Sequence, residues 1–157
     1  MLSSNHIKAL KILIKRLSNK KINWALIGST NLAIQSVNIK AHDIDILTDK
    51  EGAFKINKAL KRFEIKAVRY KESERFCSYY GLFKINNINI EIMGDIKNKI
   101  PKCDLWSEKS KLSNKLFINF KDIKLPVISL KREYYAYSKM GRKDKAEKIR
   151  ERLKNNK

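Results

Sequence analysis

One stretch of the chain, residues 26–47, limits its fold more narrowly than any other: "LIGSTNLAIQSVNIKAHDIDIL". It opens with an apolar run, passes through Gly28 and Ser29 into a short amphipathic segment, and ends on alternating Asp and Ile. The apolar run at 23–28 and the alternating run at 43–47 predict two short strands, and residues 29–36 predict a helix between them.

The rest of the chain continues this mixture of helices and strands, so we predict an α+β fold with a mixed β-sheet flanked by helices. We expect one domain, residues 1–157, with a core at about 6–128 and C-terminal helices at about 129–154. Hydrophobic spacing and turn residues predict further helices at 6–18, 48–63, 130–140 and 144–153, and strands at 64–71, 77–85, 88–93, 115–120 and 123–130.

Several local signals fix the ends of these elements. Ser29 and Ser129 are predicted helix N-caps, and "TDKE" at 48–51 and "DKAE" at 144–147 read as capping boxes. The pair at 86–87, Asn-Asn, tolerates positive φ and predicts a tight hairpin, while Gly141 predicts the end of the preceding helix.

Composition narrows the functional classes. Lys and Arg number 36 against 16 Asp and Glu, a net charge of +20, which favours a polyanionic partner such as nucleic acid, an acidic protein or nucleotide phosphates. A biased composition rich in Ile, Lys and Asn is the alternative source of that charge. No apolar run is long enough to span a membrane and no signal peptide is recognisable, so we expect a cytoplasmic protein. Cys77 and Cys103 are expected to be reduced, partly buried thiols.

Three carboxylates are the candidate metal ligands. In a strand, Asp43 and Asp45 share one face while the intervening isoleucines pack the other. In "INIEI", Glu91 likewise opposes buried isoleucines, so the three acids converge if the two strands are neighbours. Hard oxygen ligands suit Mg²⁺ or Mn²⁺, and such a cluster is typical of two-metal phosphoryl transfer. The plainer alternative is a pair of acids facing water on an edge strand.

Gly28 and Ser29 form the candidate phosphate site. A strand that ends in Gly-Ser and opens a helix directs backbone N–H groups and the positive helix end toward a bound anion. The Ser29 hydroxyl could also donate to a phosphate oxygen. Together the two elements suggest a site for a nucleoside triphosphate and its metals.

With these motifs in place, the sequence resembles the nucleotidyltransferase superfamily, which has the DNA polymerase β-like fold. The resemblance rests on "ALIGSTNLAI", the spacing to "DIDIL" and the later strand acid. Within the superfamily the sequence is most similar to small prokaryotic AbiE-type and minimal nucleotidyltransferases, and "KMGRKD" at 139–144 resembles the AbiE-type C-terminal motif. The absence of an arginine shortly after Gly-Ser favours the AbiE side over the minimal group.

This resemblance implies roles for individual residues. Asp43 and Asp45 would bind metal, and Glu91 would complete the site and could activate the acceptor hydroxyl. Gly28 and Ser29 would bind the nucleotide. Lys139, with Lys143 and Asp144 as lesser candidates, would match the C-terminal motif, and the lysines would neutralise the triphosphate. His42 and the tyrosines at 134, 135 and 137 are not assigned a role.

Three functions are consistent with these residues. The first is Mg²⁺-dependent transfer of a nucleoside monophosphate from an NTP to a large acceptor, with tRNA or another RNA favoured because a cationic aminoglycoside-type acceptor would be repelled by the net charge. The second is modification (AMPylation) of a partner protein in a toxin–antitoxin setting. The third is an inactive fold that serves as a basic RNA-binding or partner-binding module.

Overall fold

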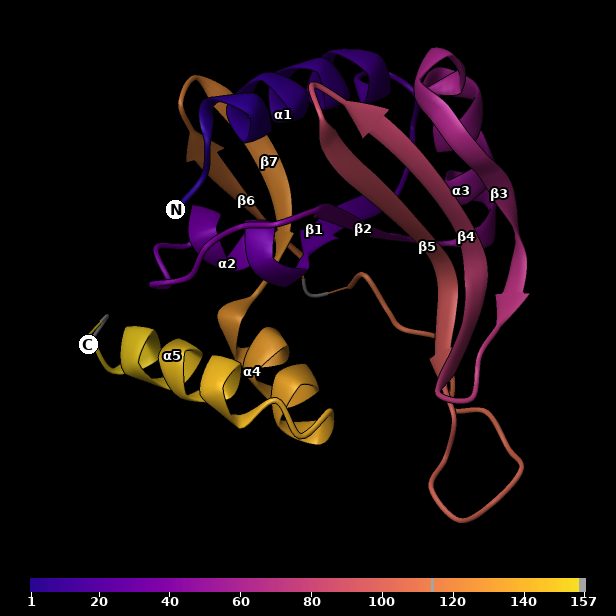
Figure 1. Cartoon of the computed structure of the whole chain (residues 1–157), viewed down its shortest axis with the longest axis vertical. Coiled ribbons are helices and arrows are strands. Elements are labelled where there is room, and N and C mark those ends of the chain that lie inside the picture. Colours follow the sequence, from indigo (N-terminus) through magenta and orange to yellow (C-terminus); the bar gives the residue numbers. More distant parts are fainter. Residues whose placement is uncertain (114, 156–157) are drawn as a thin grey trace.

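A computed structural model of the chain describes residues 1–113 and 115–155. Seven strands form one mixed sheet in the order β3-β4-β5-β2-β1-β7-β6 (Figure 1). The strands are β1 (Trp24–Ile27), β2 (Ile44–Thr48), β3 (Glu64–Glu72), β4 (Phe76–Ile85), β5 (Ile88–Asn98), β6 (Lys115–Phe120) and β7 (Ile123–Ile128). The helices are α1 (Ser4–Leu17), α2 (Gly28–Ile34), α3 (Lys50–Ala59), α4 (Leu130–Lys139) and α5 (Lys143–Lys154), with a 3₁₀ turn at Lys61–Phe63. The predicted α+β fold with a mixed sheet is confirmed.

One face of the sheet carries the main core. Leu10 and Leu13 of α1 and Ile56 of α3 pack against fully buried strand residues such as Ile46 and Ile92. In Figure 1 both helices lie on this side of the sheet, opposite the C-terminal helices. Side chains alternate between the two faces of a strand. Because the hydrophobic residues of β2 and β5 point toward α1 and α3, the polar residues between them lie on the opposite face.

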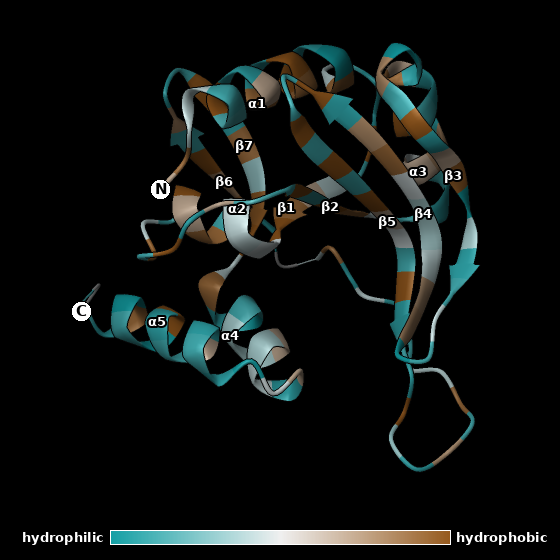
Figure 2. Ribbon diagram, viewed as in Figure 1, coloured by the Kyte–Doolittle hydropathy of each residue, from teal (hydrophilic) through white to brown (hydrophobic). Residues whose placement is uncertain are grey.

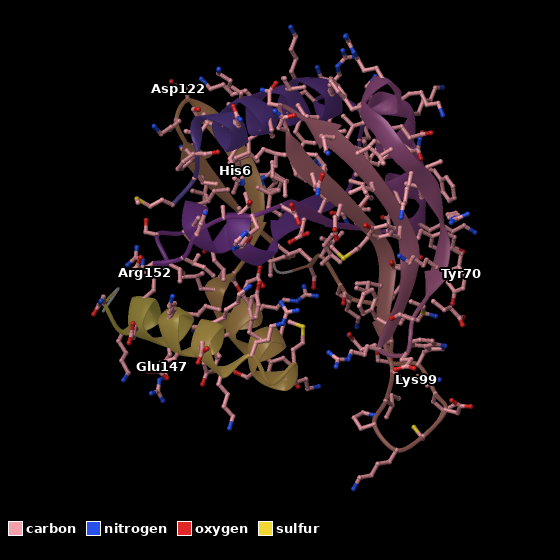
Figure 3. All side chains as sticks on the ribbon, viewed as in Figure 1. His6, Tyr70, Lys99, Asp122, Glu147 and Arg152 are labelled. Atoms are coloured by element: carbon pink, nitrogen blue, oxygen red, sulfur yellow. The ribbon has the colours of Figure 1, made fainter. Side chains whose placement is uncertain are left out.

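A second, smaller cluster joins the C-terminal helices to α2. It contains Leu32, Leu130, Tyr137, Ala146 and Ile149, all buried. The remainder of α5 is hydrophilic, as Figure 2 shows. Arg152 Nε donates to the Gln35 carbonyl at 3.1 Å and ties the far end of α5 to the segment after α2 (Figure 3). Here α4 and α5 are docked beside the ends of β1 and β7, not on the main core.

Most predicted boundaries lie within two residues of the observed ones. Asn86 and Asn87 have φ of 49° and 60° and connect β4 to β5 with Ile85 opposite Ile88. The Ser129 cap is confirmed, since its side chain accepts from the Arg132 N–H, and Gly141 follows α4 with φ +70°. The weaker hairpin, β6 with β7, is also present.

Three predicted caps are wrong. Ser29 lies inside α2, whose N-cap is Ile27 without a side-chain bond. At α3 the cap is Asp49, which accepts from the Gly52 N–H at 2.6 Å, because Thr48 is the last residue of β2 and its hydroxyl donates to the Asn23 carbonyl. The helix also ends at Ala59, before the predicted Phe63. At α5 the helix starts one residue earlier than expected, so Asp144 sits in the first turn and Arg142 occupies the cap position.

Two further details differ from the expected ones. β5 continues to Asn98, well past the predicted end at 93. Both cysteines are free, as predicted, but Cys77 is buried while Cys103 is exposed. Among the described helices, none combines the length and apolar character that crossing a bilayer requires.

Candidate active site

The acid-bearing strands are neighbours, which was the condition for the acids to converge. β2 and β5 pair in parallel with Asp45 opposite Glu91, while Ile44 and Ile46 oppose Ile90 and Ile92. All four isoleucines are fully buried in the main core. Residues opposed in register share a face, so the core side chains force Asp45 and Glu91 onto the other face of the sheet.

Side chains from two helices hold the backbone just before β2. The Ser29 hydroxyl accepts from the His42 N–H at 3.1 Å, and the Thr30 hydroxyl donates to the Asp43 carbonyl at 2.8 Å. From α1, His6 Nε2 lies 2.7 Å from the His42 carbonyl and donates to it, because a carbonyl can only accept. These bonds fix the position of Asp43, which immediately precedes the strand. Ser29 thus has a structural role that the sequence did not indicate, since its side chain is 6% exposed and already bound to the chain.

Gly28 lies directly against Asp45. Its φ is +72°, and a Cβ atom placed there would overlap the Asp45 carboxylate. Only glycine can adopt this positive φ and also leave room for the Asp45 carboxylate without strain. The Gly28 N–H donates to Glu133 Oε1 at 2.8 Å, so this donor, which the sequence assigned to a phosphate, is engaged within the protein.

Glu133 of α4 is a functional candidate that the sequence reasoning missed. It is 5% exposed, and besides Gly28 it accepts from Asn31 Nδ2 at 2.7 Å. Asn31 Nδ2 also donates to the Ile128 carbonyl at 2.9 Å, and Gln35 Nε2 donates to the same carbonyl and to Asn31 Oδ1. This network joins α2, the end of β7 and α4 beneath the acid cluster. No signal in the sequence identified Glu133, because a single acid on a helix of mixed polarity is ordinarily exposed.

Mutual repulsion makes it unfavourable for Asp43, Asp45, Glu91 and Glu133 to be ionised at the same time. Burial raises the pKa of Asp45 from 3.8 to about 7, and the negative charges of Glu91, Asp43 and Glu133 act in the same direction. Burial likewise raises the pKa of Glu133 to about 7, although its hydrogen bonds from Asn31 and Gly28 favour the charged form. A buried cluster of this kind is stabilised by a cation.

Glu91 is the more open member of the cluster and has a hydroxyl partner. The Tyr80 side chain of β4 hydrogen-bonds to the Glu91 carboxylate. Burial and the Asp43 charge raise the pKa of Glu91, while the Tyr80 bond and the Lys71 charge oppose that change. Burial and the Glu91 charge in turn raise the pKa of the Tyr80 hydroxyl to about 12. Tyr80 was not singled out from the sequence, although the hairpin register places it diagonally across from Glu91.

Lys145 of α5, which the sequence did not indicate, acts on two of the acids. The Lys145 charge lowers the pKa of both Asp45 and Glu133, so it lies on the side of the acid cluster, with Nζ 5.4 Å from the centroid of the Tyr137 ring. Lys139 and Lys143 are exposed, and Lys139 Nζ stacks over Tyr135 instead. The motif at 139–144 includes the start of α5, where Lys143 is exposed and Lys145 is half-buried.

The three carboxylates are chemically suitable ligands for a divalent cation. Asp43, Asp45 and Glu91 supply hard carboxylate oxygens, and their mutual repulsion is the kind that Mg²⁺ or Mn²⁺ relieves. Within residues 1–113 and 115–155, no three His, Cys, Asp or Glu side chains lie close enough together to enclose a metal ion as they stand.

Asp45 and Glu91 lie on adjacent strands beside Gly28 and Ser29, and two helices follow the mixed sheet. This arrangement is that of the nucleotidyltransferases. Residues 9–155 match the family described as aminoglycoside-2''-adenylyltransferase, and the chain belongs to that family. A Thermotoga maritima protein proposed to be a nucleotidyltransferase has a crystal structure that is 39% identical, with a TM-score of 0.86 over 99% of this chain and 96% of that one. No curated protein sequence matches the chain.

More distant structures share the fold. The lincosamide antibiotic adenylyltransferase LnuA, bound to lincomycin, is 16% identical with a TM-score of 0.60 over 91% of this chain and 95% of that one. The ANT(2'')-Ia complex with adenylyl-2''-tobramycin is 8% identical with a TM-score of 0.61 over 96% and 90%. The predicted superfamily is thus correct, whereas none of these comparisons supports the AbiE-type subgroup.

Proposed function

We propose that this protein transfers a nucleoside monophosphate, with ATP as the first candidate donor, to a hydroxyl group of a small acceptor. The observation that carries the proposal is the register of Asp45 with Glu91 on adjacent parallel strands, in a chain of an adenylyltransferase family. The acceptor oxygen forms a bond to the α-phosphorus, the bond from that phosphorus to the β-phosphate oxygen breaks, and pyrophosphate leaves.

Asp43, Asp45 and Glu91 are the proposed metal ligands. A bound divalent cation would supply charge stabilisation for the phosphoryl oxygens. The protein's own contribution is to keep the ligand-bearing backbone rigid. The bonds from Ser29 and Thr30 to residues 42–43, and the contact of Gly28 with Asp45, support that role.

Glu91 is the proposed general base. It accepts the proton of the attacking hydroxyl as the oxygen bonds to phosphorus. Burial raises its pKa, which makes the carboxylate a stronger base than one in water, and the Tyr80 hydrogen bond holds its orientation. A base of this kind must remain ionised at the working pH, which the nearby Lys71 charge favours.

Lys145 is the proposed principal contact for the triphosphate. Its charge acts on both Asp45 and Glu133, so it lies beside the carboxylates where phosphates would approach. The expected nucleotide contacts Lys139 and Lys143 flank it on the exposed surface and remain candidates for the terminal phosphates. Gly28 and Ser29 remain candidates for nucleotide contact, with Gly28 supporting the site by allowing the close approach of Asp45.

The relatives and the composition of the chain indicate different acceptors: the relatives favour a small molecule, and the net charge favours RNA. The two distant relatives named above act on, or carry the adenylyl product of, small hydroxylated antibiotics, and this supports a small acceptor. The RNA acceptor expected from the net charge, the AMPylated partner protein of an AbiE-type role and the inactive binding module have no support among these relatives. They are retained as outcomes of the test below.

Label transfer tests the proposal directly. The protein is incubated with each α-³²P-labelled NTP and Mg²⁺, together with small hydroxyl compounds, total RNA or a protein extract. Asp43→Asn with Asp45→Asn should abolish transfer. Asp122→Asn, an exposed acid in the distant β6–β7 turn, is the matched control and should not. If label appears only on RNA or only on protein, that macromolecule is the acceptor and the proposal of a small acceptor is wrong. If no label is transferred and no NTP binds, the protein is not a nucleotidyltransferase.

A further inference from the structure

The direction from which the acceptor approaches follows from the placement of the cations. In phosphoryl transfer the attacking and leaving oxygens lie roughly in line across the phosphorus. If the triphosphate lies toward Lys145 and the C-terminal helices, the acceptor must approach from the opposite side of the acid cluster. Glu91 and Tyr80 lie on that side, and beyond them the same face of the sheet continues across β4 to the edge strand β3.

Two cations of β3 occupy this part of the face. Arg69 is directly opposite Tyr80 in the β3–β4 register, so both side chains are on the Glu91 side of the sheet. Lys71 is two residues further on the same face, with Nζ 4.6 Å from the centroid of the Tyr80 ring. Both side chains are exposed, and the Lys71 charge reaches Glu91.

The acidic residues of β3 are turned to the other side of the sheet. Glu64 accepts from Asn57 of α3 at 2.7 Å, and α3 covers the opposite face. Glu72 accepts at 2.7 Å from the hydroxyl of Tyr70, whose ring packs edge-on against Tyr79. Tyr79 in turn contacts Phe54 of α3. The two acids of β3 therefore lie on the opposite face from Arg69 and Lys71, and Glu91 of β5 is the acid on which the Lys71 charge acts.

We infer that the acceptor is a small hydroxyl compound that carries an anionic group, a carboxylate or a phosphate, near its reactive hydroxyl. This inference rests on the proposed function and adds the charge of the substrate to it. Arg69 binds the anionic group and Lys71 assists, so Arg69 is a specificity residue. A polycation would be repelled by both side chains, within a chain of net charge +20. This chain thus differs in acceptor charge from the relative crystallised with adenylyl-2''-tobramycin.

A panel of acceptors of similar size tests the inference. Glucose 6-phosphate and gluconate are the anionic members, glucose is neutral, and lincomycin and tobramycin carry positive charge. Total RNA is included as a polyanion of a different class. Label from α-³²P-ATP should appear on an anionic member first, and its KM should increase with ionic strength because exposed charges are screened by salt.

Variants at Arg69 separate acceptor binding from catalysis. Arg69→Ala should raise the KM for the anionic acceptor about tenfold or more, as expected for a lost hydrogen bond to a charged group, with the KM for ATP unchanged. Arg69→Lys should restore part of the loss, and Arg69→Glu should increase it. Lys11→Ala, an exposed lysine of α1 on the opposite face, removes the same charge and should have no effect.

Preferential labelling of tobramycin, lincomycin, glucose or RNA would overturn the inference. So would a failure to label the anionic compounds when calorimetry shows that ATP binds. An Arg69→Glu protein with an unchanged KM for the anionic acceptor would also overturn it. Absence of both ATP binding and label transfer refutes the proposed function itself, so the two failures are distinguishable.

Discussion

Replacing Asp45 with Asn should stabilise the metal-free protein while abolishing its activity. The carboxylate is partly buried among other acids, and its pKa rises from 3.8 in the unfolded chain to about 7 in the fold. A group whose pKa is raised by folding stabilises the fold fully below the lower value, and this contribution is lost as pH rises through the higher one. Ionisation of Asp45 therefore destabilises the wild-type protein progressively as pH rises from 3.8 to about 7, and the full effect is present above that.

The size of the effect follows from that difference. About three pKa units at 1.36 kcal/mol each give roughly 4 kcal/mol as an upper limit, and relaxation of the side chains and coupling to Glu91 reduce it to about 2–4 kcal/mol. For a chain of this length that corresponds to an increase of roughly 5–15 °C in Tm. Asparagine has the same shape as aspartate and fits beside Gly28 without new overlap, so the change is mainly one of charge.

Thermal and urea unfolding in EDTA at pH 5 and pH 8 measure this prediction. Asp45→Asn should exceed wild type clearly at pH 8 and by much less at pH 5. Added Mg²⁺ should stabilise wild type and leave the variant unchanged. Asp122→Asn, exposed in the β6–β7 turn, controls for loss of one negative charge. A variant that is equal to or less stable than wild type at pH 8 would refute the reasoning that Asp45 is held in a repulsive, solvent-poor cluster.

Three further substitutions have definite expected outcomes. Gly28→Ala should lower the free energy of unfolding by roughly 2–4 kcal/mol in urea and remove activity, because φ is +72° and the new Cβ overlaps Asp45. Lys145→Ala should raise the KM for ATP about tenfold or more, while Lys11→Ala, an exposed lysine of α1 on the opposite face of the sheet, should change it less than about twofold. Glu133→Gln should raise stability relative to wild type progressively between pH 4.5 and about 7, as ionisation of the buried acid is removed; pH-dependent unfolding that is parallel for the two proteins would contradict this.

The strands and the carboxylate pair could be predicted because their information is local. Alternation of Asp and Ile in 43–47 specifies both the strand and its polar face, and "INIEI" does the same for Glu91. Their proximity required only that the two strands pair. The Asn86–Asn87 turn was equally local, since two residues with positive φ suffice to set the hairpin register.

Glu133 and Lys145 could not be predicted because their placement depends on how α4 and α5 dock. The distance along the chain from Gly28 to Glu133 is more than a hundred residues, and no periodicity specifies which helix face meets the end of β1. The motif at 139–144 covers the end of α4 and the start of α5. The packing of Ala146 and Ile149 with Leu32 of α2 sets which face of α5 is buried, and the motif does not specify that packing.

The C-terminal helices are therefore tied to the candidate site through Glu133. Glu133 binds the one N–H that Gly28 exposes at the end of β1, and Gly28 is the residue whose missing side chain admits Asp45. Through Asn31 the same carboxylate is tied to the Ile128 carbonyl, where β7 leads into α4. A displacement of α4 would leave the Gly28 N–H and the Asn31 amide without this acceptor, and would withdraw Lys145 from the acids. Because α4, which carries Glu133, packs against α5, which carries Lys145, nucleotide affinity and the position of Asp45 should change together in any variant that loosens α4.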